Sequence, residues 1–77
     1  MNKLSKKGLF IKQQKVAEKI LVYIHGYYSD YGYSPTYSEI GIQFNQSRQW
    51  AAYWLKHLEK NSVVKIDHTK HRCIIIR

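Results

Sequence analysis

Apolar residues recur every three or four positions in the first half of the chain. The residues that keep this spacing are Ala17, Ile20, Leu21, Ile24, Tyr28 and Tyr31. Such a period marks one face of an α-helix, so the pattern predicts a helix from about Phe10 to Tyr31 with these side chains turned inward. Gly32 can end this helix, because glycine readily adopts the left-handed conformation. Residues 1–9 come before the helix and are expected to form a flexible basic arm.

The segment GYSPTYSEI predicts a turn followed by a short second helix. Pro35 cannot continue the first helix. Thr36 and Glu39 have the spacing of a capping box, in which each side chain bonds the backbone N–H of the other residue. We therefore expect a helix over Tyr37–Phe44, with Ile40 and Phe44 facing the core.

A sharp turn and a third helix follow. Asn45 tolerates a positive φ better than most residues, and Ser47 is a favourable N-cap. A helix over Arg48–Lys60 has the inward stripe Ala51, Trp54, Leu55 and Leu58. Trp50 and Tyr53 fall outside this stripe and are expected to be exposed. Two helices joined at a steep angle in this way form a helix-turn-helix.

The C-terminal stretch is rich in β-branched residues. Val63–Asp67 and Arg72–Ile76 predict two strands joined by the polar turn HTKH. The side chains expected to point inward are Val64, Ile66, Ile74 and Ile76. The predicted fold is therefore mostly α with a small β-hairpin, a three-helix winged helix-turn-helix over residues 10–77.

Positive charge gathers at the two ends of the chain, and the net charge is +8. Residues 1–15 carry five lysines and no acid, whereas residues 16–46 carry one lysine and three acids. Residues 47–77 carry seven lysines or arginines and two acids. A polarised charge of this kind favours binding to a polyanion, although surface lysines also serve solubility. The lysines of the arm can likewise add affinity for a polyanion or only keep the protein soluble.

The motifs resemble the N-terminal DNA-binding domain of LexA-type repressors from about Val16 to Ile76. In GYSPTYSEI the resemblance is carried by Gly32, Pro35, Thr36, Glu39 and Ile40. In SRQWAAYWLKHLEK it is carried by Ser47, Ala51, Leu55, Lys56, Leu58 and Glu59. The hairpin VVKIDHTKHRCIIIR matches the wing of that family.

The resemblance implies a sequence-specific, double-stranded DNA-binding transcriptional regulator, and in particular a small repressor. The resemblance does not extend to the family's self-cleaving C-terminal domain, so neither autoproteolysis nor its dimer interface can be carried over. Ala52 and Tyr53 stand where the family usually has acidic residues, so the family's operator cannot be carried over either. A regulator of this length without an effector domain is typical of phage or mobile elements.

Candidate DNA contacts lie on the third helix, which enters the major groove in winged helices. The resemblance implies that Ser47 contacts phosphate and that Gln49 reads a base, and glutamine can bond adenine through two hydrogen bonds. Arg48 and Lys56 suit phosphate or guanine. The remaining candidates on this helix are Trp50, Ala52 and Tyr53. Trp50 has an open alternative, which is packing on the arm or on a partner protein.

The wing, residues 67–72, supplies a second group of candidates. Lys70, His71 and Arg72 are expected to contact the minor groove or its phosphates. The alternative is a charged hairpin that only protects an edge strand from pairing. One helix and one wing read only a few base pairs, so we also expect a homodimer on DNA.

The sequence offers little for catalysis or metal binding. His68, His71 and Cys73 lack the fourth ligand that a structural zinc site needs, so we expect no metal and no cofactor. We find no paired carboxylates, no phosphate-binding glycine loop and no nucleophile with a base, and we expect no enzyme. No apolar run is long enough for a membrane span, and a cytoplasmic location is expected. The alternative function is a protein-interaction module that uses exposed aromatics on a host protein or a second copy.

Overall fold

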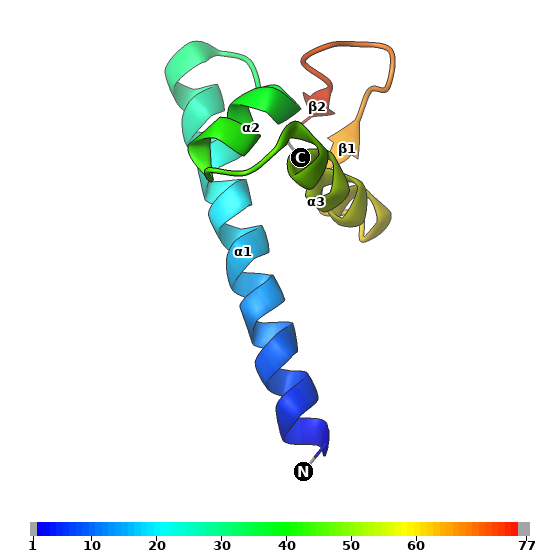
Figure 1. Ribbon diagram of the computed structural model, residues 1–77. Helices are drawn as coiled ribbons and strands as arrows, with labels where there is room; N and C mark the ends of the chain where they lie inside the picture. The colour runs from blue at the N-terminus through cyan, green and yellow to red at the C-terminus, as the bar shows by residue number, and fades with distance from the viewer. Residues whose placement is uncertain (1, 76–77) are drawn as a thin grey trace.

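The computed structural model describes residues 2–75 of the chain, and the side chains of residues 15–75. Three helices are followed by a two-stranded antiparallel hairpin (Figure 1). The elements are α1 (Asn2–Tyr31), α2 (Tyr37–Gln43), α3 (Arg48–Lys60), β1 (Lys65–Ile66) and β2 (Ile74–Ile75). The predicted fold class, a helix-rich domain with a hairpin wing, is confirmed.

The observed bounds agree with the predicted ones most closely where local signals are strong. α3 covers Arg48–Lys60 as predicted, and α2 ends one residue early, with Phe44 as its C-cap. α1 begins at Asn2, so its bounds include most of the predicted arm. The flexibility of residues 1–9 stays a prediction. Figure 1 shows the N-terminal half of α1 extending away from the other elements.

The hairpin is shorter than predicted. Each strand has two residues, paired as Lys65 with Ile75 and Ile66 with Ile74. Val63 does not extend β1, because its N–H donates to the carbonyl oxygen of Leu58 and so closes the end of α3. The expected inward position of Ile76 lies outside the described residues.

The turn between α2 and α3 is built by local backbone chemistry. Asn45 has a φ of 57°, which confirms the predicted left-handed turn. The N–H of Gln46 donates to the carbonyl oxygen of Gly41 at 2.7 Å, so the chain folds back tightly over α2. A Cβ atom at Gly41 would lie 2.8 Å from the carbonyl oxygens of Gln46 and Ser47. The helix-turn-helix angle therefore requires glycine at this position, which the sequence motifs did not reveal.

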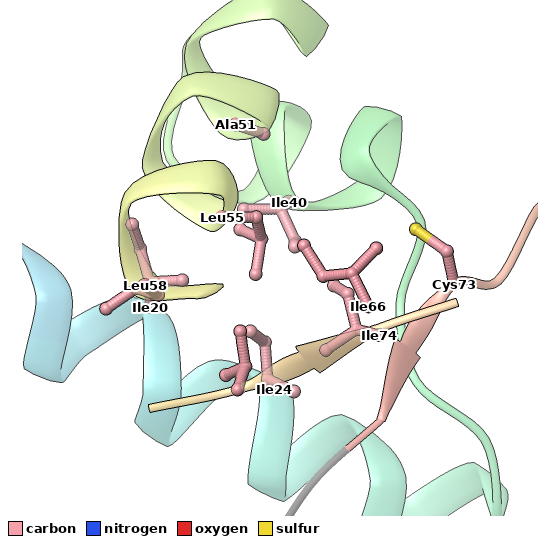
Figure 2. Close-up of a cluster of buried hydrophobic side chains, with 10 residues drawn as sticks. Ile20, Ile24, Ile40, Ala51, Leu55, Leu58, Ile66, Cys73 and Ile74 are labelled. Carbon is pink, nitrogen blue, oxygen red and sulfur yellow. The ribbon is translucent and has the colours of Figure 1, made fainter. Parts of the chain in front are cut away.

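The core lies where α1, α2, α3 and the hairpin meet, as Figure 2 shows. Its buried residues are Ile20, Ile24, Ile40, Ala51, Leu55, Leu58, Val64, Ile66, Cys73 and Ile74. The predicted inward positions of Tyr28 and Tyr31 are wrong, since both are exposed. The face that α1 turns to the core passes instead through Tyr23 and Tyr27, which are half-buried.

Within residues 2–75, no helix is both long enough and apolar enough to cross a bilayer.

Candidate nucleic-acid interface

Helix α3 presents three faces. One face enters the core through Ala51, Leu55 and Leu58. A second face carries aromatic residues, and the ring of Trp54 lies 6.3 Å from that of Trp50 and 6.0 Å from that of His57. The third face lines a groove toward the wing. From the sequence, the residues outside the core stripe of α3 form a single exposed group. Tertiary packing divides this group into an aromatic face and a groove face.

The groove face brings four predicted contacts together. A hollow of about 430 Å³ lies between α3 and the hairpin. Its lining on α3 consists of Gln49, Ala52, Tyr53 and Lys56. Tyr37, Ile66 and His68 form the remainder of the lining. Tyr53 is 67% exposed, as its predicted position outside the core stripe requires.

A second hollow, of about 190 Å³, joins the start of α3 to the tip of the wing. Arg48 lines it together with Lys70 and His71, so three further predicted contacts come together here. Tyr37 and His68 line both hollows, which makes them parts of one surface. Ser47 precedes Arg48 and is exposed. Its hydroxyl oxygen accepts the N–H of Trp50 at 3.0 Å, which confirms its role as N-cap.

Trp50 is not the exposed contact that the sequence predicted. Its indole is half-buried and packs with the ring of Phe44, with ring centroids 5.7 Å apart. Trp54, which was predicted in the core, is also only half-buried. α3 is therefore rotated slightly from the predicted orientation, and the two indoles share the face away from the groove.

Arg72 points from the wing toward α1 and α2. Its Nη1 donates to Glu39 Oε1 at 2.8 Å, to the carbonyl oxygen of Ser34 at 2.9 Å and to Tyr27 Oη at 3.3 Å. Its Nη2 donates to Glu39 Oε2 at 3.3 Å. The guanidinium also lies 4.3 Å from the centre of the Tyr33 ring. Both terminal nitrogens of the guanidinium thus bond groups within the protein, so the geometry gives Arg72 an internal role.

The carboxylate of Glu39 serves two structures at once. Its Oε1 accepts the backbone N–H of Thr36 at 2.8 Å, and Thr36 Oγ1 accepts the N–H of Glu39 at 3.1 Å, which confirms the capping box. The same carboxylate receives the guanidinium of Arg72. The hydrogen bond from Arg72, followed by the one from Thr36, lowers the pKa of Glu39 to about 2.

The tip of the wing is shaped by Asp67. Its Oδ1 accepts the N–H and the hydroxyl of Thr69, and these bonds lower the pKa of the Asp67 carboxyl. Lys70 Nζ lies 3.9 Å from Asp67 Oδ2, and the Lys70 side chain is 72% exposed. His68 Nε2 lies 2.9 Å from Glu59 Oε2, which ties the wing to the end of α3. Lys70 is thus held near the groove with its ammonium group in water.

The two residues that line both hollows, Tyr37 and His68, were missed by sequence reasoning. His68 belongs to the same polar turn as Lys70 and could have been found from that neighbourhood. Tyr37 has no local signal, because its place depends on α2 packing beside the end of the hairpin. Burial first, and then the neighbouring Cys73 thiol, raises the pKa of the Tyr37 phenol.

Within the described residues, no three His, Cys, Asp or Glu side chains gather in a group that could hold a metal ion. Comparisons of the chain with protein-family models, with curated proteins and with solved structures find no match. The resemblance to LexA-type repressors therefore rests on the motifs in the sequence.

Proposed function

We propose that this protein is a sequence-specific, double-stranded DNA-binding transcriptional regulator that acts as a small repressor. In this proposal α3 enters the major groove and the wing contacts the adjacent backbone or minor groove. The proposal rests on the winged helix-turn-helix fold, on the grouping of the predicted contacts along one surface, and on the charge of that surface.

The charge of the surface is the observation that carries the proposal. Three cationic side chains line the two hollows between α3 and the wing, namely those of Arg48, Lys56 and Lys70. His68 and His71 accompany them. Among the described residues that line these hollows there is no Asp or Glu. Two other hollows, along α1, have mixed charge: Lys15 and Lys19 line one together with Glu18, and Asp30 lines the other. The groove face differs in that its charged lining is cationic throughout, as contact with a phosphate backbone requires.

The residues of the groove divide by chemistry into base and phosphate contacts. Gln49 carries an amide that can bond adenine, and Ala52 beside it offers a methyl group to thymine. Arg48, Lys70 and His71 line the hollow at the tip of the wing and suit phosphate. The remaining members of the proposed set are Ser47, Tyr53 and Lys56. Arg72 is left out because both its terminal nitrogens bond groups within the protein. Trp50 is left out because it lies on the other face of α3.

The alternative function is a protein-interaction module that uses exposed aromatic and apolar side chains. Tyr53 and Ile75 are exposed and available for such a role. Trp50, which would have been its strongest anchor, is half-buried against Phe44. This packing reduces the apolar area that the face can offer, so we favour DNA binding.

Selection of binding sites from random DNA, followed by mobility shifts across a salt series, tests the proposal. We expect a preferred sequence, and an affinity that falls about tenfold or more as salt rises from 50 to about 300 mM. Docking to a protein through aromatics would survive that salt. Equal affinity for all DNA sequences at every salt concentration would contradict sequence-specific regulation.

A further inference from the structure

One face of α1 offers a long groove that the DNA-binding surface does not use. Two hollows of about 480 and 360 Å³ lie along it and share Val22, Tyr23 and Gln43. Val22 is 72% exposed although it is apolar. Lys15, Glu18 and Lys19 line the hollow toward the start of the helix, and Asp30 lines the one toward its end. The groove thus has an apolar middle, one end where two lysines outnumber one glutamate, and an acidic end.

We propose that this groove binds α1 of a second copy of the chain in antiparallel orientation. Lys15 lies seven residues before Val22, and Asp30 lies seven residues after Tyr23. A two-fold axis between Val22 and Tyr23 therefore places Lys15 of each copy opposite Asp30 of the other. Seven residues correspond to about 10 Å of helix, so a near-parallel crossing of about 20° keeps both pairs within reach of the long lysine side chains. The surface is self-complementary, as a two-fold interface must be.

Gly26 gives the second argument for this occupant. Within the described part of the chain, a Cβ atom added at Gly26 would meet no heavy atom within 4 Å. The proposed axis sets Gly26 opposite Lys19 of the other copy. The missing side chain lets the aliphatic part of Lys19 lie across the backbone and lets the two helices approach closely. Val22 and Tyr23 face their counterparts at the centre.

The strength of this dimer follows from its size. A single helix pair with one apolar centre belongs to the small interfaces, which are weak. We expect a dissociation constant on the order of 10 to 1000 µM, which corresponds to about −4 to −7 kcal/mol. Such a dimer forms partly in solution, and any ligand that holds two copies side by side strengthens it.

Sedimentation equilibrium of the full chain, without DNA and over a range of protein and salt concentrations, tests the proposal. Lys15→Glu should weaken association about tenfold, since each dimer loses two ion pairs and gains two repulsions. Lys60→Glu on α3 is the matched control: it changes the net charge equally and should not weaken association. Lys15→Glu combined with Asp30→Lys should restore the dimer, because the pairs are then only exchanged.

Gly26→Gln provides an independent variant. It should abolish association, while the temperature of thermal unfolding stays the same or rises, because glutamine favours helix over glycine. A chain that stays monomeric up to about 1 mM would overturn the proposal, and so would a dimer unaffected by Gly26→Gln. Failure of the charge exchange to restore the dimer would overturn the antiparallel register. Since no DNA is present, these results do not depend on the proposed regulatory function.

Discussion

Arg72 and Glu39 are 33 residues apart in the sequence and are joined by two hydrogen bonds, of 2.8 and 3.3 Å. The pair connects the hairpin to the first turn of α2, and Tyr27 of α1 donates to the same carboxylate at 2.9 Å. One ion pair therefore links three elements. Because Lys70 and His71 directly precede Arg72, this pair also sets where the tip of the wing lies relative to α3.

Glu39→Gln is expected to weaken DNA binding about fivefold to thirtyfold through loss of wing positioning. Glutamine keeps the capping box, so α2 retains its start. If only net charge mattered, removing the negative charge of Glu39 would strengthen binding to DNA. We expect weaker binding, because the wing loses its anchor. Arg72→Met should have a similar effect, and the double variant should be no weaker than either single one. Fluorescence anisotropy on a selected site measures this cycle, and tighter binding by Glu39→Gln would contradict it.

The same carboxylate predicts how stability depends on pH. The pKa of Glu39 falls from 4.5 to about 2 on folding, so folding favours the ionised form. Its contribution is complete above about pH 4.5 and is lost as the pH falls toward 2. Because 34% of the Glu39 side chain is exposed, screening limits this contribution to about 1–2 kcal/mol. Denaturant unfolding should therefore show a gap between wild type and Glu39→Gln at pH 6 that closes near pH 2.

Gln49 and Lys70 should behave differently on DNA. Gln49→Ala should cost about 1–3 kcal/mol on the preferred site and relax the preference at one base pair. Lys70→Ala should weaken all sequences alike and reduce the salt slope by about one. Titrations of both variants on matched and mismatched sites separate the two roles. Identical behaviour would mean that our division into base and phosphate contacts is wrong.

The two tryptophans should now give similar results. Both indoles are half-buried on one face of α3, so truncation of either should destabilise the fold by about 1–3 kcal/mol. Leu55→Ala, at a fully buried position, should cost more, about 2–5 kcal/mol. Urea unfolding monitored by circular dichroism compares the three variants. If Trp50→Ala left the stability unchanged, the result would support the exposed position that the sequence predicted for Trp50.

Gly41 and Gly26 form a matched pair for backbone packing. Gly41→Ala should destabilise the domain by about 1–3 kcal/mol, because its Cβ would lie 2.8 Å from backbone carbonyl oxygens. Gly26→Ala should stabilise it by about 0.5–1 kcal/mol, since it has open space and gains helix propensity. Thermal unfolding of the two variants gives the signs directly. If Gly41→Ala did not lower the unfolding temperature, the turn between α2 and α3 would be able to relax around the added methyl group.

The sequence by itself determined the features whose contacts are local. The capping box of Thr36 and Glu39 joins residues three apart, the N-cap of Ser47 reaches Trp50, and Asn45 needs only its own φ. Such interactions depend on residue type and spacing, so α2, α3 and the turn between them could be predicted. The β-branched runs around a polar turn likewise predicted the hairpin, and the period of the apolar positions predicted most of the core.

Tertiary structure decided the features whose partners are distant in the sequence. Arg72 could be assigned to DNA from its place in a basic turn, but its donors reach a carboxylate on another element. The packing of Phe44 against Trp50 set the rotation of α3, and the path of α1 past the core left Tyr28 exposed. A period of 3.6 residues locates a helix but not its rotation to within one side chain, because neighbouring positions at the edge of the apolar face differ little in hydrophobic energy. Contacts made by the other elements decide between them.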